Sequence, residues 1–143
     1  MYALGIDGGG SHTRALLCDA NGQIIGQGLS KGTNLRACSA AILKAHLQEA
    51  IDQATQSIDC SKIIAAHFGL AGAGEADTRA KVSTITKELL GEQTACTIGH
   101  DLEIALAGGL ADKTGIVLVA GTGSACYGRT CDGRSAKCGD WGD

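Results

Sequence analysis

A glycine-rich stretch near the N-terminus combines a carboxylate, three glycines and two hydroxyl groups. Residues 7–13 read Asp-Gly-Gly-Gly-Ser-His-Thr. Glycine lets a ligand approach the main chain closely, and successive inward N–H groups form a concavity that suits phosphate oxygens. Asp7 would repel phosphate, so its place here favours a magnesium ion, which is usually held by one or two carboxylates and substrate phosphates. A β-hairpin turn with a capping aspartate explains the same residues equally well.

A second glycine-rich stretch, residues 121–124 (Gly-Thr-Gly-Ser), follows the apolar run 115–120. Its N–H and hydroxyl groups can donate hydrogen bonds to phosphate without adding negative charge. Such a turn needs no ligand, and by itself it is weak evidence. Both stretches follow apolar runs that we expect to form strands at the centre of one sheet, with their ends on one side. Together they predict a phosphate site with two loops.

Asp101 is the candidate catalytic residue. It follows the short apolar run 94–98 and precedes an apolar segment that begins at Leu102. Phosphoryl transfer needs a carboxylate that orients the attacking hydroxyl and accepts its proton. The structural alternative is that Asp101 caps the helix beginning at Leu102, and the two roles are compatible.

Composition limits the classes of protein that can carry these loops. The chain has 143 residues, of which 44% are apolar and 19% charged, with a net charge of −3. These values are typical of one globular domain and do not indicate a nucleic-acid or acidic-membrane partner. Seven cysteines form no disulfide framework, and Cys126, Cys131 and Cys138 lack a C-x-x-C pair for zinc. Reduced thiols and the absence of a signal peptide or membrane-length apolar run predict a cytoplasmic protein.

The elements that must position the loops follow from periodicity and turn signals. Apolar runs and an Asn-Gly turn at 21–22 predict strands over 2–6, 13–19, 23–29, 62–70, 94–98, 115–120 and 125–130. Helical spacing predicts helices over 37–58, 76–90 and from 102 onward, with Gly91 as the C′ residue of the second helix. The near-continuous apolar runs 62–70 and 115–120 predict fully buried strands. His46 lies on the apolar stripe of the first helix and is interpreted as a packed core residue.

The resulting order, βββαβαβα with short strands after it, predicts an α/β fold with a ribonuclease H-like mixed sheet and helices on both faces. The first loop, placed between two adjacent strands, resembles the first phosphate motif of the superfamily of sugar kinases, actin and heat-shock chaperone ATPases.

Within that superfamily, the chain resembles the N-acetylglucosamine and glucosamine kinases, which are close relatives of the activator ATPases of acyl-CoA dehydratases. The matching stretches span the chain in order and are residues 5–11, 32–34, 69–73, 100–101, 120–124 and 138–142. Two departures stand out: Asp140 replaces a glycine of the Gly-Gly-Trp-Gly loop, and Ala71-Gly72 replaces a Ser-Gly of animal members.

The resemblance implies ATP and Mg²⁺ as cofactors, and it implies a role for each matching residue. Asp101 would be the base and would contact the sugar, and Asp7 would hold magnesium through water. The expected phosphate contacts are Gly8, Gly9, Gly10, Ser11, Thr13, Gly121, Thr122, Gly123 and Ser124. The expected sugar contacts are Asn34, Gly72, Asp101, Thr122, Gly139 and Trp141. Two alternatives stay open: Asn34 as a turn-forming residue and Trp141 as a hinge-packing residue.

The predicted function is phosphorylation of an amino sugar, N-acetylglucosamine or glucosamine, at its 6-hydroxyl. One alternative is an activator ATPase coupled to electron transfer, although Leu118-Val119-Ala120 stands where activators carry a cysteine. The other is a non-catalytic sugar sensor. Residues 1–143 are expected to form an N-terminal domain of a homodimeric kinase, without the second, adenosine-binding domain, and to be inactive alone.

Overall fold

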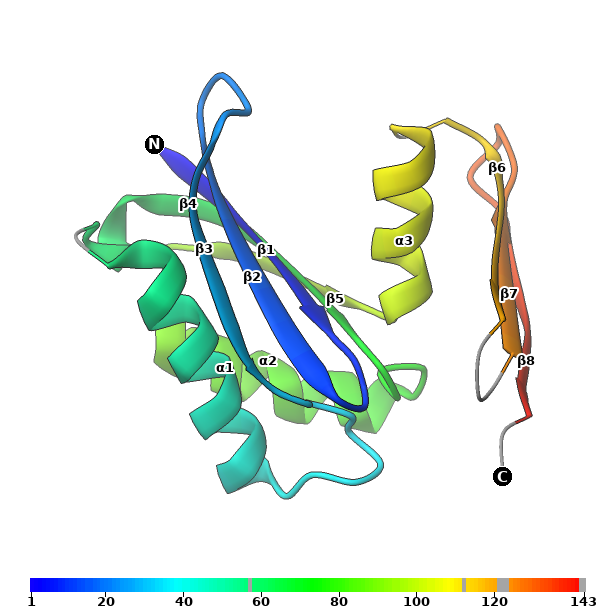
Figure 1. Cartoon of the computed structure of the whole chain (residues 1–143), viewed down its shortest axis with the longest axis horizontal. Helices are drawn as coiled ribbons and strands as arrows, with labels where there is room; N and C mark the ends of the chain where they lie inside the picture. Colours follow the sequence, from blue (N-terminus) through cyan, green and yellow to red (C-terminus); the bar gives the residue numbers. More distant parts are fainter. Residues whose placement is uncertain (57, 112, 121–123, 142–143) are drawn as a thin grey trace. The chain divides into compact units, whose positions relative to one another are not determined.

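A five-stranded mixed sheet is built by residues 1–100 in this computed structural model (Figure 1). Its order is β3-β2-β1-β4-β5, in which the pairs β3–β2 and β2–β1 are antiparallel and the pairs β1–β4 and β4–β5 are parallel. The strands are β1 (Tyr2–Gly8), β2 (His12–Asp19), β3 (Ile24–Lys31), β4 (Ile63–Leu70) and β5 (Ala95–Gly99). The structure describes residues 1–56, 58–111, 113–120 and 124–141.

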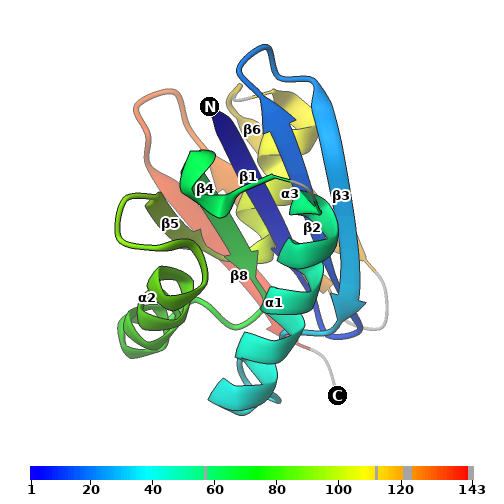
Figure 2. The ribbon, with the colours of Figure 1, turned by 90° about the vertical axis from the view of Figure 1, so that its left-hand side faces the viewer.

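Two helices, α1 (Ala40–Thr55) and α2 (Ala76–Leu90), cover one face of this sheet (Figure 2). The Ser39 side chain caps α1 by accepting a hydrogen bond from the N–H of Ile42 at 3.3 Å. α2 ends at Leu90 and is followed by Gly91, whose φ of 87° is a left-handed conformation that glycine adopts without strain, so the predicted glycine at the helix end is confirmed. A short 3₁₀ turn, η1 (Cys60–Lys62), leads into β4.

The core of this unit lies between the sheet and the two helices. Its fully buried large side chains are Ile6, Leu17, Leu47, Ile51, Ile63, Phe68, Leu70 and Val82. Burial alternates along β1, where Leu4, Ile6 and Gly8 face the helices. In β4, Ile64 is 50% exposed, so the expectation that this strand is covered on both faces is wrong.

Residues 101–143 form a second compact unit. It consists of α3 (Asp101–Leu110) and an antiparallel sheet in the order β6-β7-β8, built from β6 (Gly115–Ala120), β7 (Ser124–Arg129) and β8 (Ser135–Trp141). Leu102, Leu106 and Tyr127 form its small core.

The two sheets correct an expectation about β6. That strand pairs with β7 in the second unit, so the hypothesis that both glycine stretches follow strands of one sheet is wrong. The expectation that β6 is fully buried is also wrong, because Ile116 and Leu118 are 73% and 69% exposed. The apolar residues of this run predict a buried strand, but they do not specify which sheet the strand joins.

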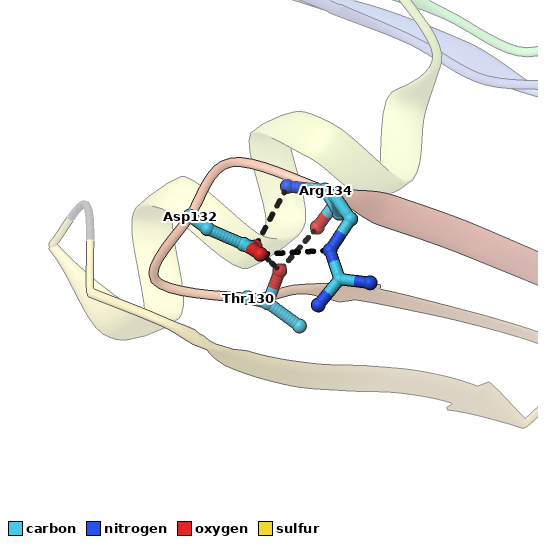
Figure 3. A network of polar contacts seen from close by, with 3 residues as sticks. All are labelled: Thr130, Asp132 and Arg134. Carbon is cyan, nitrogen blue, oxygen red and sulfur yellow. Dashed lines mark hydrogen bonds and ion pairs between the residues drawn. The ribbon is translucent and has the colours of Figure 1, made fainter.

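The turn between β7 and β8 is closed by polar contacts among Thr130, Asp132 and Arg134 (Figure 3). The Thr130 hydroxyl contacts the Asp132 carboxylate, and the carboxylate accepts from Arg134 through Nε at 2.7 Å and the backbone N–H at 3.3 Å. The Thr130 hydroxyl bond, followed by the Arg134 backbone and side-chain bonds, lowers the pKa of Asp132, because all of them favour the ionised form.

The element order βββαβαβα and the ribonuclease H-like mixed sheet are confirmed. Among the described residues, no helix has the length and apolar character needed to cross a membrane.

Candidate functional site

Asp7 occupies the penultimate position of β1, next to the glycine loop. It is the register partner of Arg14 on β2 and of Gly69 on β4. Because Ile6 and Gly8 face the core, alternation places Asp7 on the opposite face of the sheet. Its side chain is 43% exposed, and Oδ2 lies 3.9 Å from Nη1 of Arg14. A half-exposed carboxylate suits a cation that also binds substrate phosphates, since magnesium commonly uses only one or two protein carboxylates.

The three glycines of the loop have different surroundings. A Cβ at Gly8 would lie 2.1 Å from Thr33 Oγ1 and 2.5 Å from Leu70 Cδ2, so packing alone requires glycine there. At Gly9 the nearest contact would be the His12 carbonyl at 3.7 Å, and at Gly10 a Cβ would meet no described atom within 4 Å. Neither Gly9 nor Gly10 has a positive φ.

The described part of the chain therefore supplies no packing or left-handed backbone that demands glycine at position 10. The Gly9 N–H donates to the His12 carbonyl at 2.9 Å and closes the turn, while Gly10 and Ser11 are exposed. A loop that stays bare of side chains on its outer surface is suited to close approach by a ligand. This is the main geometric support for a phosphate contact.

Thr13 differs from the other predicted phosphate contacts because its side chain is fully buried. Its Oγ1 donates to the Lys31 carbonyl at 2.8 Å and lies 2.9 Å from Oγ1 of Thr33. This hydroxyl therefore supports the loop from beneath, and a phosphate contact through it would require the core to open.

The segment that follows β4 lies against the glycine loop, and the segment that follows β3 lies against both. The Ala71 N–H donates to the Gly8 carbonyl at 2.7 Å, and the Leu35 N–H donates to the Ala71 carbonyl at 3.0 Å. Gly72 has a φ of 87°, and a Cβ there would lie 3.3 Å from Oδ1 of Asn34. The structure thus brings two predicted sugar contacts, Asn34 and Gly72, to the end of the sheet that carries the glycine loop. The turn-forming role of Asn34 is confirmed, since its Oδ1 accepts from the Arg36 N–H at 3.0 Å.

Asp101 belongs to the second unit, where it is the first residue of α3. Its Oδ1 accepts a hydrogen bond from the N–H of Leu102 at 3.1 Å, and the residue is half-buried. The carboxylate therefore binds the start of the helix, one residue earlier than predicted. Ser124 begins β7 and is exposed, whereas the predicted contacts Gly121, Thr122 and Gly123 lie outside the described residues.

Residues 139–141, which the resemblance to the Gly-Gly-Trp-Gly loop of the family predicts to be a loop, are the end of strand β8. Gly139 has a φ of 96°, and a Cβ there would lie 2.5 Å from the Ser124 carbonyl oxygen, next to an irregularity in the β7–β8 register. Glycine is required at this position by the sheet itself, as is common at bulges. The expectation of a loop at Gly139–Trp141 is therefore wrong.

Sequence reasoning missed the role of Thr33. This side chain is fully buried and lies between the two loops, because its N–H donates to the Gly9 carbonyl at 3.0 Å and its hydroxyl contacts Thr13. Thr33 belongs to the matching stretch 32–34, but nothing in the sequence indicated that its side chain would face inward.

Comparison with known proteins defines the class of protein first. The chain belongs to the BadF/BadG/BcrA/BcrD ATPase family, which matches residues 4–143.

Two relatives with named activities match nearly the whole chain. The chain is 35% identical over 146 residues to the N-acetylmuramic acid/N-acetylglucosamine kinase of Clostridium acetobutylicum, covering 99% of this chain and 46% of the relative. It is 30% identical over 149 residues to the N-acetyl-D-glucosamine kinase of Dictyostelium discoideum, covering 97% of this chain and 47% of the relative. The chain thus spans about half the length of these curated relatives.

A solved structure supports the fold. The crystal structure of a proposed N-acetylglucosamine kinase from Chromobacterium violaceum superimposes with a TM-score of 0.76 at 24% identity, covering 99% of this chain and 49% of that chain.

Proposed function

We propose that this chain is the N-terminal part of an ATP-dependent kinase that phosphorylates an amino sugar at its 6-hydroxyl. One observation carries the proposal: relatives 35% and 30% identical over nearly the whole chain are both named as kinases of N-acetylglucosamine. The geometry of the first unit supports the proposal. The exposed tip of the glycine loop, the half-exposed Asp7 carboxylate and the Asn34 side-chain amide lie at the same end of the sheet.

The outer surface of the loop at Gly9, Gly10 and Ser11 would receive phosphate oxygens. Gly10 has the open space that close approach requires, and the exposed Ser11 can donate through its hydroxyl. Asp7 would hold magnesium, which neutralises charge on the phosphates when bound. Arg14, whose Nη1 lies 3.9 Å from Oδ2 of Asp7, would orient the carboxylate when the metal site is not in use.

Asn34 and Gly72 would form the sugar side of the site. With its Oδ1 bound by the Arg36 N–H, Asn34 would offer Nδ2 to a sugar hydroxyl, which can accept a hydrogen bond. Asp101 would accept the proton of the attacking 6-hydroxyl. It follows β5 by two residues, and the end of β5 shares a register row with Gly69 and Asp7.

We further propose that the two units together form the N-terminal half of the enzyme, and that the adenosine contacts come from polypeptide outside residues 1–143. A transferring phosphoryl group would otherwise remain solvated. Magnesium dependence, a homodimer and a cytoplasmic location remain predictions.

Calorimetric titration tests the substrate class. The protein to titrate is a polypeptide carrying this chain and the second half that its relatives possess. We expect N-acetylglucosamine or glucosamine to bind and glucose to bind at least tenfold more weakly, with N-acetylmuramic acid as an additional ligand because a relative is named for it. Equal binding of glucose, or no binding of any amino sugar, would contradict the assignment.

A further inference from the structure

Three polar side chains of α1 form a row along β3 and its exit. His46, Glu49 and Gln53 are spaced i, i+3 and i+7, so they lie on one side of the helix. Gln53 Oε1 accepts from the Leu29 N–H at 3.0 Å, and Glu49 Oε2 accepts from the Ser30 hydroxyl at 2.5 Å. At the loop end of the row, Nδ1 of His46 lies 2.8 Å from the Gly32 carbonyl oxygen. Because a carbonyl can only accept, Nδ1 must carry the hydrogen.

The main chain of β3 lies unusually close to α1. A Cβ at Gly26 would lie 1.9 Å from the Ala54 carbonyl oxygen, and one at Gly28 would lie 2.0 Å from the Ala50 carbonyl oxygen. β3 is also an edge strand of the sheet. Helix α1 therefore satisfies the Leu29 N–H of this edge strand and the Ser30 hydroxyl beside it, and it fixes the path of the strand.

The segment that leaves β3 is packed directly on the glycine loop. A Cβ at Gly32 would lie 2.0 Å from the Gly10 carbonyl oxygen. The next residue, Thr33, donates its N–H to the Gly9 carbonyl at 3.0 Å. The following residue is Asn34, the proposed sugar contact. Residues 32–34 therefore contact α1 through Gly32 and the glycine loop through Thr33, and they carry Asn34 next to both contacts.

We propose that His46 is a positioning residue for this site. Its hydrogen bond to Gly32 holds residues 32–34 against the glycine loop, which fixes Asn34 relative to the phosphate-binding surface. Sugar binding at Asn34 and phosphate binding at Gly9–Ser11 are thereby coupled through one rigid segment. The ligand part of this inference rests on the proposed function; the positioning part does not.

Hydrogen exchange of the 143-residue chain tests the positioning directly. His46→Ala should raise the exchange rate of the Thr33 N–H about fivefold or more, the ratio that corresponds to loss of one hydrogen bond of average net strength. His46→Asn should restore protection, because Asn Nδ2 is as many bonds from Cα as His Nδ1 and can donate to the same carbonyl. Gln53→Ala is the matched control, since it removes a hydrogen bond that the same row makes to Leu29 within β3, away from the loop.

Faster Thr33 exchange in His46→Ala, with wild-type rates in His46→Asn and Gln53→Ala, would support the proposal. Equal exchange rates at Thr33 in all three variants would overturn it, as would equally increased rates in His46→Ala and Gln53→Ala, which would reveal general loosening of β3.

A ligand arm then uses N-acetylglucosamine and the polypeptide that also carries the second half. We expect His46→Ala to weaken binding about fivefold and Gln53→Ala to leave it unchanged. Unchanged affinity in His46→Ala would overturn the coupling. If the unmutated protein binds no amino sugar, the proposed function fails, while the exchange result still decides the positioning role.

Discussion

Alanine at the first glycine of the loop, Gly8, should lower stability, whereas alanine at the third, Gly10, should weaken ligand binding and leave stability nearly unchanged. In Gly8→Ala, the new methyl group would lie 2.1 Å from Thr33 Oγ1 and 2.5 Å from Leu70 Cδ2, both in a closed environment. In Gly10→Ala, it would meet no described atom within 4 Å, and the backbone is not in the left-handed region. The first substitution thus tests packing, and the second tests ligand access.

The magnitudes follow from these distances. Overpacking typically costs about 1–3 kcal/mol, and a unit of about 100 residues loses about 4–8 °C in Tm for each kcal/mol. Gly8→Ala should therefore lower the Tm by roughly 4–24 °C. Gly10→Ala should change stability by less than about 1 kcal/mol, with a small gain from the reduced entropy of the unfolded chain. If phosphate lies against Gly10, the same overpacking range predicts roughly 5- to 150-fold weaker ATP binding.

The assays are thermal unfolding of the 143-residue chain and ATP titration of the polypeptide that includes the second half. Ser11→Ala, which removes only a hydroxyl at the exposed tip, serves as a control with a smaller expected loss of ATP affinity. Gly10→Ala with full stability and full ATP affinity would refute the assignment of this loop as a close phosphate contact. A fully stable Gly8→Ala would refute the packing argument.

Four further outcomes are expected. In the polypeptide with both halves, Asp101→Asn should lower turnover by orders of magnitude while sugar affinity falls much less; near wild-type turnover would leave Asp101 with only its helix-start role. Asp7→Ala should raise the magnesium concentration needed for turnover, measured by magnesium titration, and an unchanged requirement would remove Asp7 from the metal site. Because the folded-state pKa of Asp132 is lowered, its stabilising contacts are complete above the unfolded value of about 3.9 and are lost as pH falls through the folded value, so the Arg134 amide signal should shift below pH about 4; the same titration in Asp132→Asn should be flat, and an equal shift there would contradict the argument. The 143-residue chain alone should show no sugar-dependent ADP release in a coupled assay, and robust turnover would contradict the proposed location of the adenosine site.

The first unit was largely predictable because its local signals agree with its tertiary packing. The helix predicted over 76–90 matches α2 at both ends, since an apolar stripe and a glycine at its end gave consistent boundaries. The meander of β1, β2 and β3 followed from tight turns, including Gly22 with a φ of 79°.

Other features could not be read from periodicity. The apolar run of β6 indicates a strand but does not distinguish a sixth strand of the first sheet from an edge strand of another. The row of His46, Glu49 and Gln53 was hidden for a similar reason. His46 is interpreted from the sequence as a packed core residue, and the exposed side chains of Glu49 and Gln53 resemble a solvated helix face until the edge strand that they contact is known. The need for glycine at 139 likewise depends on a carbonyl fifteen residues earlier in the chain.

Phosphorus NMR of the polypeptide with both halves, incubated with ATP, magnesium and N-acetylglucosamine or glucosamine, tests the central claim most directly. The account predicts that ATP is consumed only when an amino sugar is present and that the γ-phosphoryl group appears as a sugar 6-phosphate ester in amounts equal to the ADP formed. Release of inorganic phosphate at a rate independent of the sugar would contradict the kinase assignment and favour an ATPase with another role.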